Sequence, residues 1–165
     1  MESNTRRVAH AVVLVAIGVA LAPYTSFPIG IAKINPTQHF VNVLGAVLLG
    51  PCWAVIIATV IGVIRNVLGV GTLLAFPGGM IGAFLAGLLY RQTRNIYVGA
   101  AGEITGTGFI APVASALLVA PVFMGKNIPL LALIPSFLAS TVAGSILGIL
   151  ALKLLQRAEI VDLEV

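Results

Sequence analysis

The chain has 165 residues, of which 59% are hydrophobic and only 8% are charged. Its mean hydropathy is +1.12. Soluble domains carry about 25% charged residues, so these values exclude an ordinary soluble protein. Nine Lys and Arg against five Asp and Glu give a net charge of +4. We attribute the basic excess to the ends of membrane helices and expect no nucleic-acid partner.

Five runs without Asp, Glu, Lys or Arg are each longer than the roughly 20 residues that a helix needs to cross a bilayer. They lie between Arg7 and Lys33, Lys33 and Arg65, Arg65 and Arg91, Glu103 and Lys126, and Lys126 and Lys153. The runs are continuous and lack the alternation of membrane β-strands. We therefore predict an all-α fold, a polytopic membrane protein with six transmembrane helices in one domain, 1–165. In chain order, the helices are expected at 8–22, 36–50, 51–68, 78–90, 96–123 and 129–155.

Details of these elements follow from local signals. The first run lacks a small-residue cleavage site, so we expect a membrane span and not a signal peptide. Residues 24–35 and 65–77 are expected to be loops. Pro77 should break the chain before the fourth helix, and Pro112 and Pro121 should bend the fifth.

Lysine and arginine predict the orientation of the bundle. With both termini in the cytoplasm, the inner side carries more basic residues than the outer side, as the positive-inside rule requires. A ligand pocket should then open outward, because the longer loops face that way. The inner set is Arg6, Arg7, Arg91, Arg94, Lys153 and Arg157, and the outer set is Lys33, Arg65 and Lys126.

The start of the second helix is unusually polar. Asn35 should cap this helix, with Pro36 at its first position and Gln38 three residues after the cap. Gln38, His39 and Asn42 lie three or four residues apart and share one face. Lipid would penalise unpaired polar groups there. The face should therefore point inward, either as hydrogen-bonded packing between helices or as the wall of a polar pocket.

Other polar residues raise the same alternatives. Arg65 either extends to the outer headgroups or joins a pocket, and its neighbour Asn66 is the better pocket candidate. Glu103 is acidic within an apolar region and is a site candidate by default, with His39 or Arg65 as its partner. A buried structural ion pair is the alternative. Thr107 follows in a glycine-rich stretch that favours close helix packing.

Catalytic and metal-binding patterns are missing from the sequence. It contains no GxxxxGK[ST] loop, no HExxH, no nucleophile elbow and no His/Cys/Asp cluster with metal-ligand spacing. We therefore expect no enzyme activity, no cofactor and no metal. Cys52 is a single cysteine, so the chain forms no internal disulfide.

Four stretches in combination are similar to one family. They read FPIGIAKINPTQHFVNVLGAVLLGP, IRNVLGVGTLLAFPGGMIGAFLAGLLYR, GEITGTGFIAPV and STVAGSILG. The chain resembles the ThiW family, substrate-binding S components of energy-coupling factor (ECF) transporters. The resemblance covers nearly the whole chain. It implies a subunit in the plasma membrane of a prokaryote that binds hydroxyethylthiazole, a thiazole alcohol and thiamine precursor, from outside.

The resemblance also implies partners and site residues. An S component docks within the bilayer on a transmembrane coupling subunit that carries two ATP-binding subunits. Family members dock through an alanine stripe on the first helix, here Ala9, Ala16 and Ala20, interrupted by Val13. The implied substrate-binding residues are Gln38, His39, Asn42, Asn66, Phe76, Glu103 and Thr107.

A thiazole alcohol suits an apolar slot with a few polar groups. We expect His39 or Asn42 to donate to the ring nitrogen, Glu103 to accept from the hydroxyl, and Phe76 or Phe40 to stack on the ring. Three alternatives stay open. They are an S component for thiamine or its pyrimidine precursor, a self-sufficient proton-coupled carrier, and a purely structural membrane protein.

Overall fold

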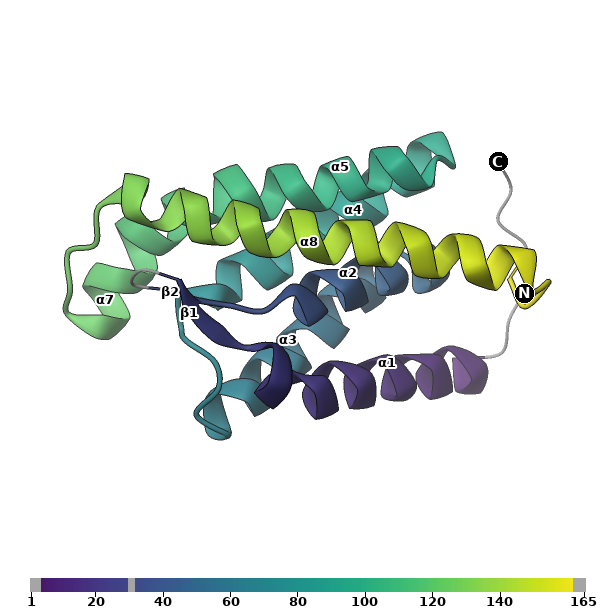
Figure 1. The fold of residues 1–165 in the computed structure, drawn as a ribbon, viewed down its shortest axis with the longest axis horizontal. Coiled ribbons are helices and arrows are strands. Elements are labelled where there is room, and N and C mark those ends of the chain that lie inside the picture. The colour runs from purple at the N-terminus through teal and green to yellow at the C-terminus, as the bar shows by residue number, and fades with distance from the viewer. Residues whose placement is uncertain (1–3, 30–31, 162–165) are drawn as a thin grey trace.

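The computed structural model of the protein describes residues 4–29 and 32–161. Its helices run along the long axis of an elongated bundle (Figure 1). α1 (Asn4–Thr25) begins and α8 (Leu130–Arg157) ends at the same end of this bundle, and a two-stranded hairpin lies toward the other end. The first and last helices therefore share one end of the bundle. The cytoplasmic location of that end remains a prediction.

The second and third helices lie where the sequence predicts them. α2 (Pro36–Leu49) and α3 (Pro51–Val67) are joined by Gly50, which has a φ of 91°. Glycine adopts a positive φ without steric cost, and Pro51 then suits the first position of the next helix. The Gly-Pro pair therefore reverses the chain in a single residue.

α4 (Ala75–Thr93) begins three residues before the predicted start at 78. Pro77 lies in its first turn and does not break the chain, so that prediction was wrong. The physical reason is that the first N–H groups of a helix have no partner within the helix, so a proline there removes no hydrogen bond.

Residues 96–124 form one uninterrupted helical run in which α-helical and π-helical winding alternate. Two π-helical segments, η1 (Gly106–Ile110) and η2 (Ser115–Val119), each end two residues before a proline, Pro112 and Pro121. A proline cannot donate to the preceding turn, and a wider turn absorbs the missing bond. The α-helical parts of the run are α5 (Ile96–Thr105), α6 (Ala111–Ala114) and α7 (Ala120–Met124).

The segment between α1 and α2 is a β-hairpin and not the loop that the sequence predicted. β1 (Phe27–Ile29) pairs antiparallel with β2 (Ala32–Ile34), and Pro28 lies opposite Lys33. Strands of three residues are too short to show a recognisable alternation. The hairpin places Lys33 shortly before the start of α2 at Pro36. Its Nζ donates to the carbonyl oxygen of Gly69, which follows α3, at 2.8 Å.

α2 is the central helix, in contact with α1, α3, α4, α5 and α8. Its apolar residues pack with Leu14 of α1, Ile61 of α3 and Leu152 of α8 in one buried cluster. α8 approaches closely through Gly144, where a Cβ would lie 2.6 Å from the Cβ of His39. Since helices surround α2 on all sides, its polar residues face protein and not lipid.

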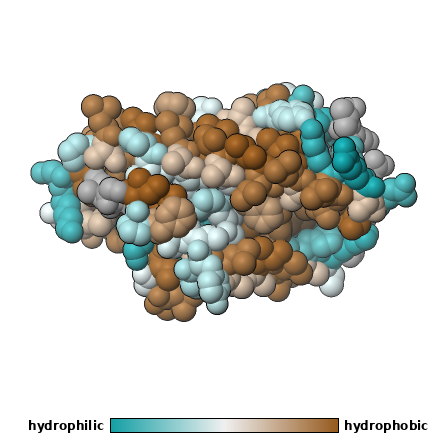
Figure 2. All heavy atoms as spheres, in the orientation of Figure 1, coloured by the Kyte–Doolittle hydropathy of each residue, from teal (hydrophilic) through white to brown (hydrophobic). Residues whose placement is uncertain are grey.

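The surface of the bundle is that of a membrane protein. Figure 2 shows apolar residues along the middle of one face, with hydrophilic residues gathered at both ends. Three helical runs are long and apolar enough to cross a bilayer, namely Asn4–Thr25, Ile96–Met124 and Leu130–Arg157, and Pro51–Val67 is a shorter apolar helix. At 14 residues, α2 is about 21 Å long, less than the roughly 30 Å of a bilayer core. Six complete spans therefore remain a prediction.

Candidate ligand-binding site

The start of α2 is built as the sequence predicted. The Oδ1 atom of Asn35 accepts a hydrogen bond from the backbone N of Gln38 at 2.8 Å, and Pro36 occupies the first turn. This cap satisfies a helix N–H that would otherwise lack a partner. The Gln38 side chain does not fold back toward the cap, and its Nε2 donates to Oδ1 of Asn42 at 3.2 Å. The cap therefore starts the helix and leaves Gln38 free for the polar face.

Glu103 organises the inner part of the site. It is fully buried, and its Oε1 lies 2.7 Å from Nδ1 of His39, 3.0 Å from Nδ2 of Asn42 and 3.0 Å from Oγ1 of Thr107. Its Oε2 has no hydrogen-bond partner. One carboxylate oxygen thus connects α2 with the α5–η1 run, and the sequence-based pairing of Glu103 with His39 is observed.

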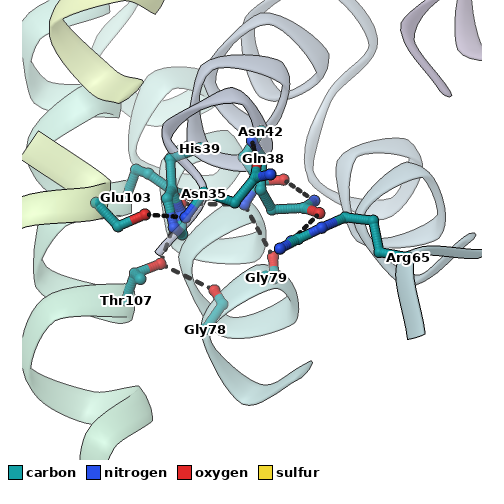
Figure 3. A network of polar contacts seen from close by, with 10 residues as sticks. Asn35, Gln38, His39, Asn42, Arg65, Gly78, Gly79, Glu103 and Thr107 are labelled. Atoms are coloured by element: carbon teal, nitrogen blue, oxygen red, sulfur yellow. Dashed lines mark hydrogen bonds and ion pairs between the residues drawn. The ribbon is translucent and has the colours of Figure 1, made fainter. Parts of the chain in front are cut away.

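α4 closes this cluster with its backbone. Asn42 Nδ2 lies 3.2 Å from the carbonyl oxygen of Gly79, and Thr107 Oγ1 lies 2.9 Å from that of Gly78 (Figure 3). At Gly82, one turn further, a Cβ would lie 2.7 Å from Glu103 Oε2 and would also clash with Thr107. Glycine at this position therefore lets the carboxylate reach the helix interface.

Arg65 neither extends to the headgroups nor pairs with Glu103. It is 3% exposed, and its two terminal nitrogens lie 3.4 Å from Gln38 Oε1 and 3.3 Å from Ser26 Oγ. Its Nε has no partner. Arg65 instead connects with Glu103 through a chain of side-chain amides, Gln38 and then Asn42 (Figure 3). The expected extension to the headgroups and the expected pairing with Glu103 were both wrong, because neutral amides on α2 lie nearer to Arg65 than the carboxylate does. The alternative that Arg65 joins a pocket is observed, since it lines a cavity at this end of α2.

A cavity opens above this network, at the hairpin end of α2. Its volume is about 30 Å³, counting positions open to the centre of a water-sized sphere. On this measure a single water needs about 10–15 Å³. The predicted residues Gln38, His39 and Thr107 line it, whereas Asn42 and Glu103 lie behind the lining. Polar side chains therefore form part of the cavity wall, and two of them, His39 and Thr107, contact the buried carboxylate of Glu103.

Two predicted substrate-binding residues, Asn66 and Phe76, lie outside the cavity lining, and so does Phe40, the alternative stacking residue. Asn66 is only partly buried, and its Nδ2 donates to the carbonyl oxygen of Gly62 one turn earlier in α3, at 2.8 Å. Phe76 lies against the same position, since a Cβ on Gly62 would lie 3.3 Å from its ring. Phe40 is partly buried and packs against the apolar cluster around α2. Arg65 lies on the face of α3 that points toward the cavity. Asn66 is the next residue along the helix, so its side chain points away from the cavity.

Most of the lining residues were not among the predicted substrate-binding residues. Lys33 arrives with the hairpin, while Ser136, Phe137 and Ser140 come from α8. Ser140 Oγ accepts from the backbone N of Asn35 at 2.9 Å, and Ser136 Oγ donates to a hairpin carbonyl at 2.8 Å. The four-residue spacing of the two serines was the available signal, because it puts them on one helix face.

The residues of the predicted docking stripe lie together on the outside of α1. Ala9, Val13, Ala16 and Ala20 are all exposed. The buried residues of α1, among them Leu14, lie on its opposite face. The structure thus shows an exposed small-residue stripe, and its use in docking remains a prediction. Among the described residues, no group of three or more His, Cys, Asp or Glu is placed to hold a metal ion.

The architecture resembles that of a solved structure described as "Structure and mechanism of the S component of a bacterial ECF transporter". The match has a TM-score of 0.78 at 19% sequence identity and covers 94% of this chain and 98% of that one. At this identity, the similarity establishes the fold. A search of curated proteins found no match to the chain.

Fold and site together define the class: an all-α membrane protein with the S-component fold and a cavity lined partly by polar side chains at one end of the bundle. The sequence model of one family, described as "Thiamine-precursor transporter protein (ThiW)", matches residues 8–158. The chain belongs to the ThiW family.

Proposed function

We propose that this chain is the substrate-binding S component of an ATP-driven ECF importer and that it binds hydroxyethylthiazole from outside. The observation that carries the proposal is the cavity beside His39, whose ring Glu103 holds at 2.7 Å. Polar groups from α2, α3 and the η1 turn converge there within an otherwise apolar bundle. Membership in a thiamine-precursor transporter family supports the choice of ligand.

The chemistry of the lining suits a small heteroaromatic alcohol. His39 and Gln38 offer hydrogen-bonding groups to the ring nitrogen, and Phe137 supplies an aromatic surface in the role first expected of Phe76. Glu103 acts through its neighbours, because it lies outside the cavity lining and its Oε1 contacts His39 and Thr107, which line the cavity. A thiazole alcohol is larger than the cavity, so the lining must move apart when the ligand enters.

The proposal includes partners. The chain docks on a transmembrane coupling subunit with two ATP-binding subunits, through the stripe at Ala9, Ala16 and Ala20. The exposure of this stripe on α1 supports the proposal. The bundle end with the start of α1 and the end of α8 faces the cytoplasm of a prokaryotic cell, and the cavity faces outward.

Calorimetry on the detergent-purified chain tests this function. Wild type should bind hydroxyethylthiazole, and His39→Ala should weaken binding at least about tenfold, since one hydrogen bond to a ligand in a buried site is worth about 1.5 kcal/mol. His10→Ala is the matched control, because His10 is exposed on α1. Equal affinity in both variants would remove His39 from the site, and no binding by folded wild type would reject the ligand.

The His39–Glu103 contact also favours a second candidate, a self-sufficient proton-coupled carrier in which this pair relays protons. Uptake in liposomes separates the two. An S component alone should not accumulate ligand, with or without a pH gradient. Accumulation driven by a pH gradient in the absence of ATP-binding subunits would establish the carrier.

A further inference from the structure

The hairpin end of the cavity is positively charged. Arg65 and Lys33 both line it, and Arg65 is 3% exposed. A guanidinium keeps its charge at every physiological pH. Taking such a charge out of water is unfavourable unless an opposite charge or strong acceptors receive it. Arg65 therefore needs a negatively charged partner or strong hydrogen-bond acceptors.

The described part of the chain supplies no counter-charge. Among residues 4–29 and 32–161, no carboxylate oxygen lies within 4.0 Å of an Arg65 nitrogen. Glu103 is engaged by His39 and two further side chains, and Glu159 is exposed beyond the end of α8. The acceptors that Arg65 does have, on Gln38 and Ser26, are neutral and lie 3.3 to 3.4 Å away, at the long limit of hydrogen bonding.

The same part of the cavity offers donors in excess of acceptors. The Nε of Arg65 is buried without a partner. Ser140 Oγ accepts from a backbone N–H at 2.9 Å, which leaves its own O–H to donate. Lys33 adds an ammonium group that donates to a carbonyl oxygen at 2.8 Å. Unused donors and two cations around one cavity are the complement of an oxyanion, and an Arg fork binds carboxylate and phosphate oxygens in pairs.

We propose that Arg65 and Lys33 form an anion subsite, so that the preferred ligand is a thiazole whose side arm ends in a carboxylate or a phosphate ester. This inference rests on the proposed function, because it places the thiazole ring beside His39 and the acidic arm at Arg65. It also separates the ligand from thiamine, since two cations in the lining repel a cationic ring.

Calorimetry on the full-length chain tests the subsite with three probes: hydroxyethylthiazole, the thiazole with an acetic acid arm, and the phosphate ester of the alcohol. In wild type, at least one acidic probe should bind about tenfold or more tightly than the alcohol, as expected for charge-assisted hydrogen bonds to Arg. The comparison of the two acids identifies which oxyanion the subsite takes. Thiamine should bind more weakly than any of the three.

Arg65→Gln should remove the preference, so that the acidic probe loses at least about tenfold more affinity than the alcohol does. Lys33→Gln should weaken the acid by a smaller factor, because Lys33 is less buried. Lys126→Gln is the charge-matched control, since Lys126 is exposed and lies outside the cavity lining. Thermal unfolding of each variant reports its folding, and the wild-type comparison of acid with alcohol does not depend on any variant.

The results that would overturn the anion subsite can be told apart from those that would also reject the proposed function. Tighter or equal binding of the alcohol by wild type overturns the anion subsite and leaves the proposed function standing. An equal loss for all probes in Arg65→Gln gives Arg65 a structural role and also overturns it. Failure of all three probes to bind folded wild type rejects the thiazole function and, with it, the subsite.

Discussion

Nδ1 of His39 lies 2.7 Å from Oε1 of Glu103, although 64 residues separate the two in the chain. The same oxygen lies 3.0 Å from Thr107 Oγ1, on the next turn of its own helical run. A single buried carboxylate therefore ties the central helix to the α5–η1 run and fixes the position of the imidazole at the cavity. The binding function proposed for the cavity depends on this contact.

Replacing the carboxylate should destabilise the protein. Glu103→Gln removes the negative charge that His39, Asn42 and Thr107 share, and an unsatisfied buried polar contact costs about 1–3 kcal/mol. We expect a loss of that size in the free energy of unfolding, measured in detergent. Glu159→Gln, at an exposed position, should change it by less than about 0.5 kcal/mol. Indistinguishable stabilities would show that the network contributes little to the fold.

Two asparagines give a matched test of the network. Asn42 connects Gln38, Gly79 and Glu103, whereas Asn66 donates only to a carbonyl of its own helix. Asn42→Ala should weaken ligand binding about tenfold, because Gln38 and Glu103 both lose a partner behind the lining. Asn66→Ala should change the affinity less than about twofold. A larger effect at Asn66, read by calorimetry, would contradict the structure of the site.

The orientation can be tested with the native cysteine. Cys52 is exposed at the start of α3, at the end of α2 that lies away from the hairpin. If that end is cytoplasmic, a membrane-impermeant maleimide should label Cys52 only after the cells are permeabilised. Lys126→Cys in a Cys52→Ser background should be labelled in intact cells, because Lys126 follows α7 at the other end. The reverse pattern would invert the predicted topology.

The alanine stripe should matter for coupling and not for ligand binding. Ala16→Leu adds bulk to the exposed face of α1, where a partner helix would approach closely. We expect ligand affinity of the isolated chain within about twofold of wild type, and a loss of ATP-driven uptake by the full complex of tenfold or more. Ala139→Leu, exposed on α8, is the control. Normal uptake with Ala16→Leu would place the docking face elsewhere.

Much of the fold was predictable from sequence because long apolar runs separated by proline, glycine and charge leave few alternatives. The α2 start at Pro36 and the Gly50 turn followed from local backbone chemistry. The β-hairpin did not, since three-residue strands carry no pattern of their own. Pro77 was misjudged because its effect depends on whether it lies in the first turn of a helix or before it.

The site was predictable where one face of one helix defined it. Gln38, His39 and Asn42 had to point the same way, and Glu103 needed a buried partner. The rotation of α3 was not encoded locally, so Asn66 was chosen beside Arg65 although adjacent residues point about 100° apart. Ser136 and Ser140 carry a weak signal in the sequence, because a serine in an apolar helix can also bond its own backbone.

The most direct measurement is a crystal structure of the protein with a bound thiazole. The proposed function predicts that the ring lies between His39 and Phe137, within hydrogen-bond distance of His39 or Gln38, in a cavity larger than its present volume of about 30 Å³. A ligand bound on the lipid-facing surface, or elsewhere in the bundle while His39 and Glu103 keep their contact beside an unchanged cavity, would contradict it.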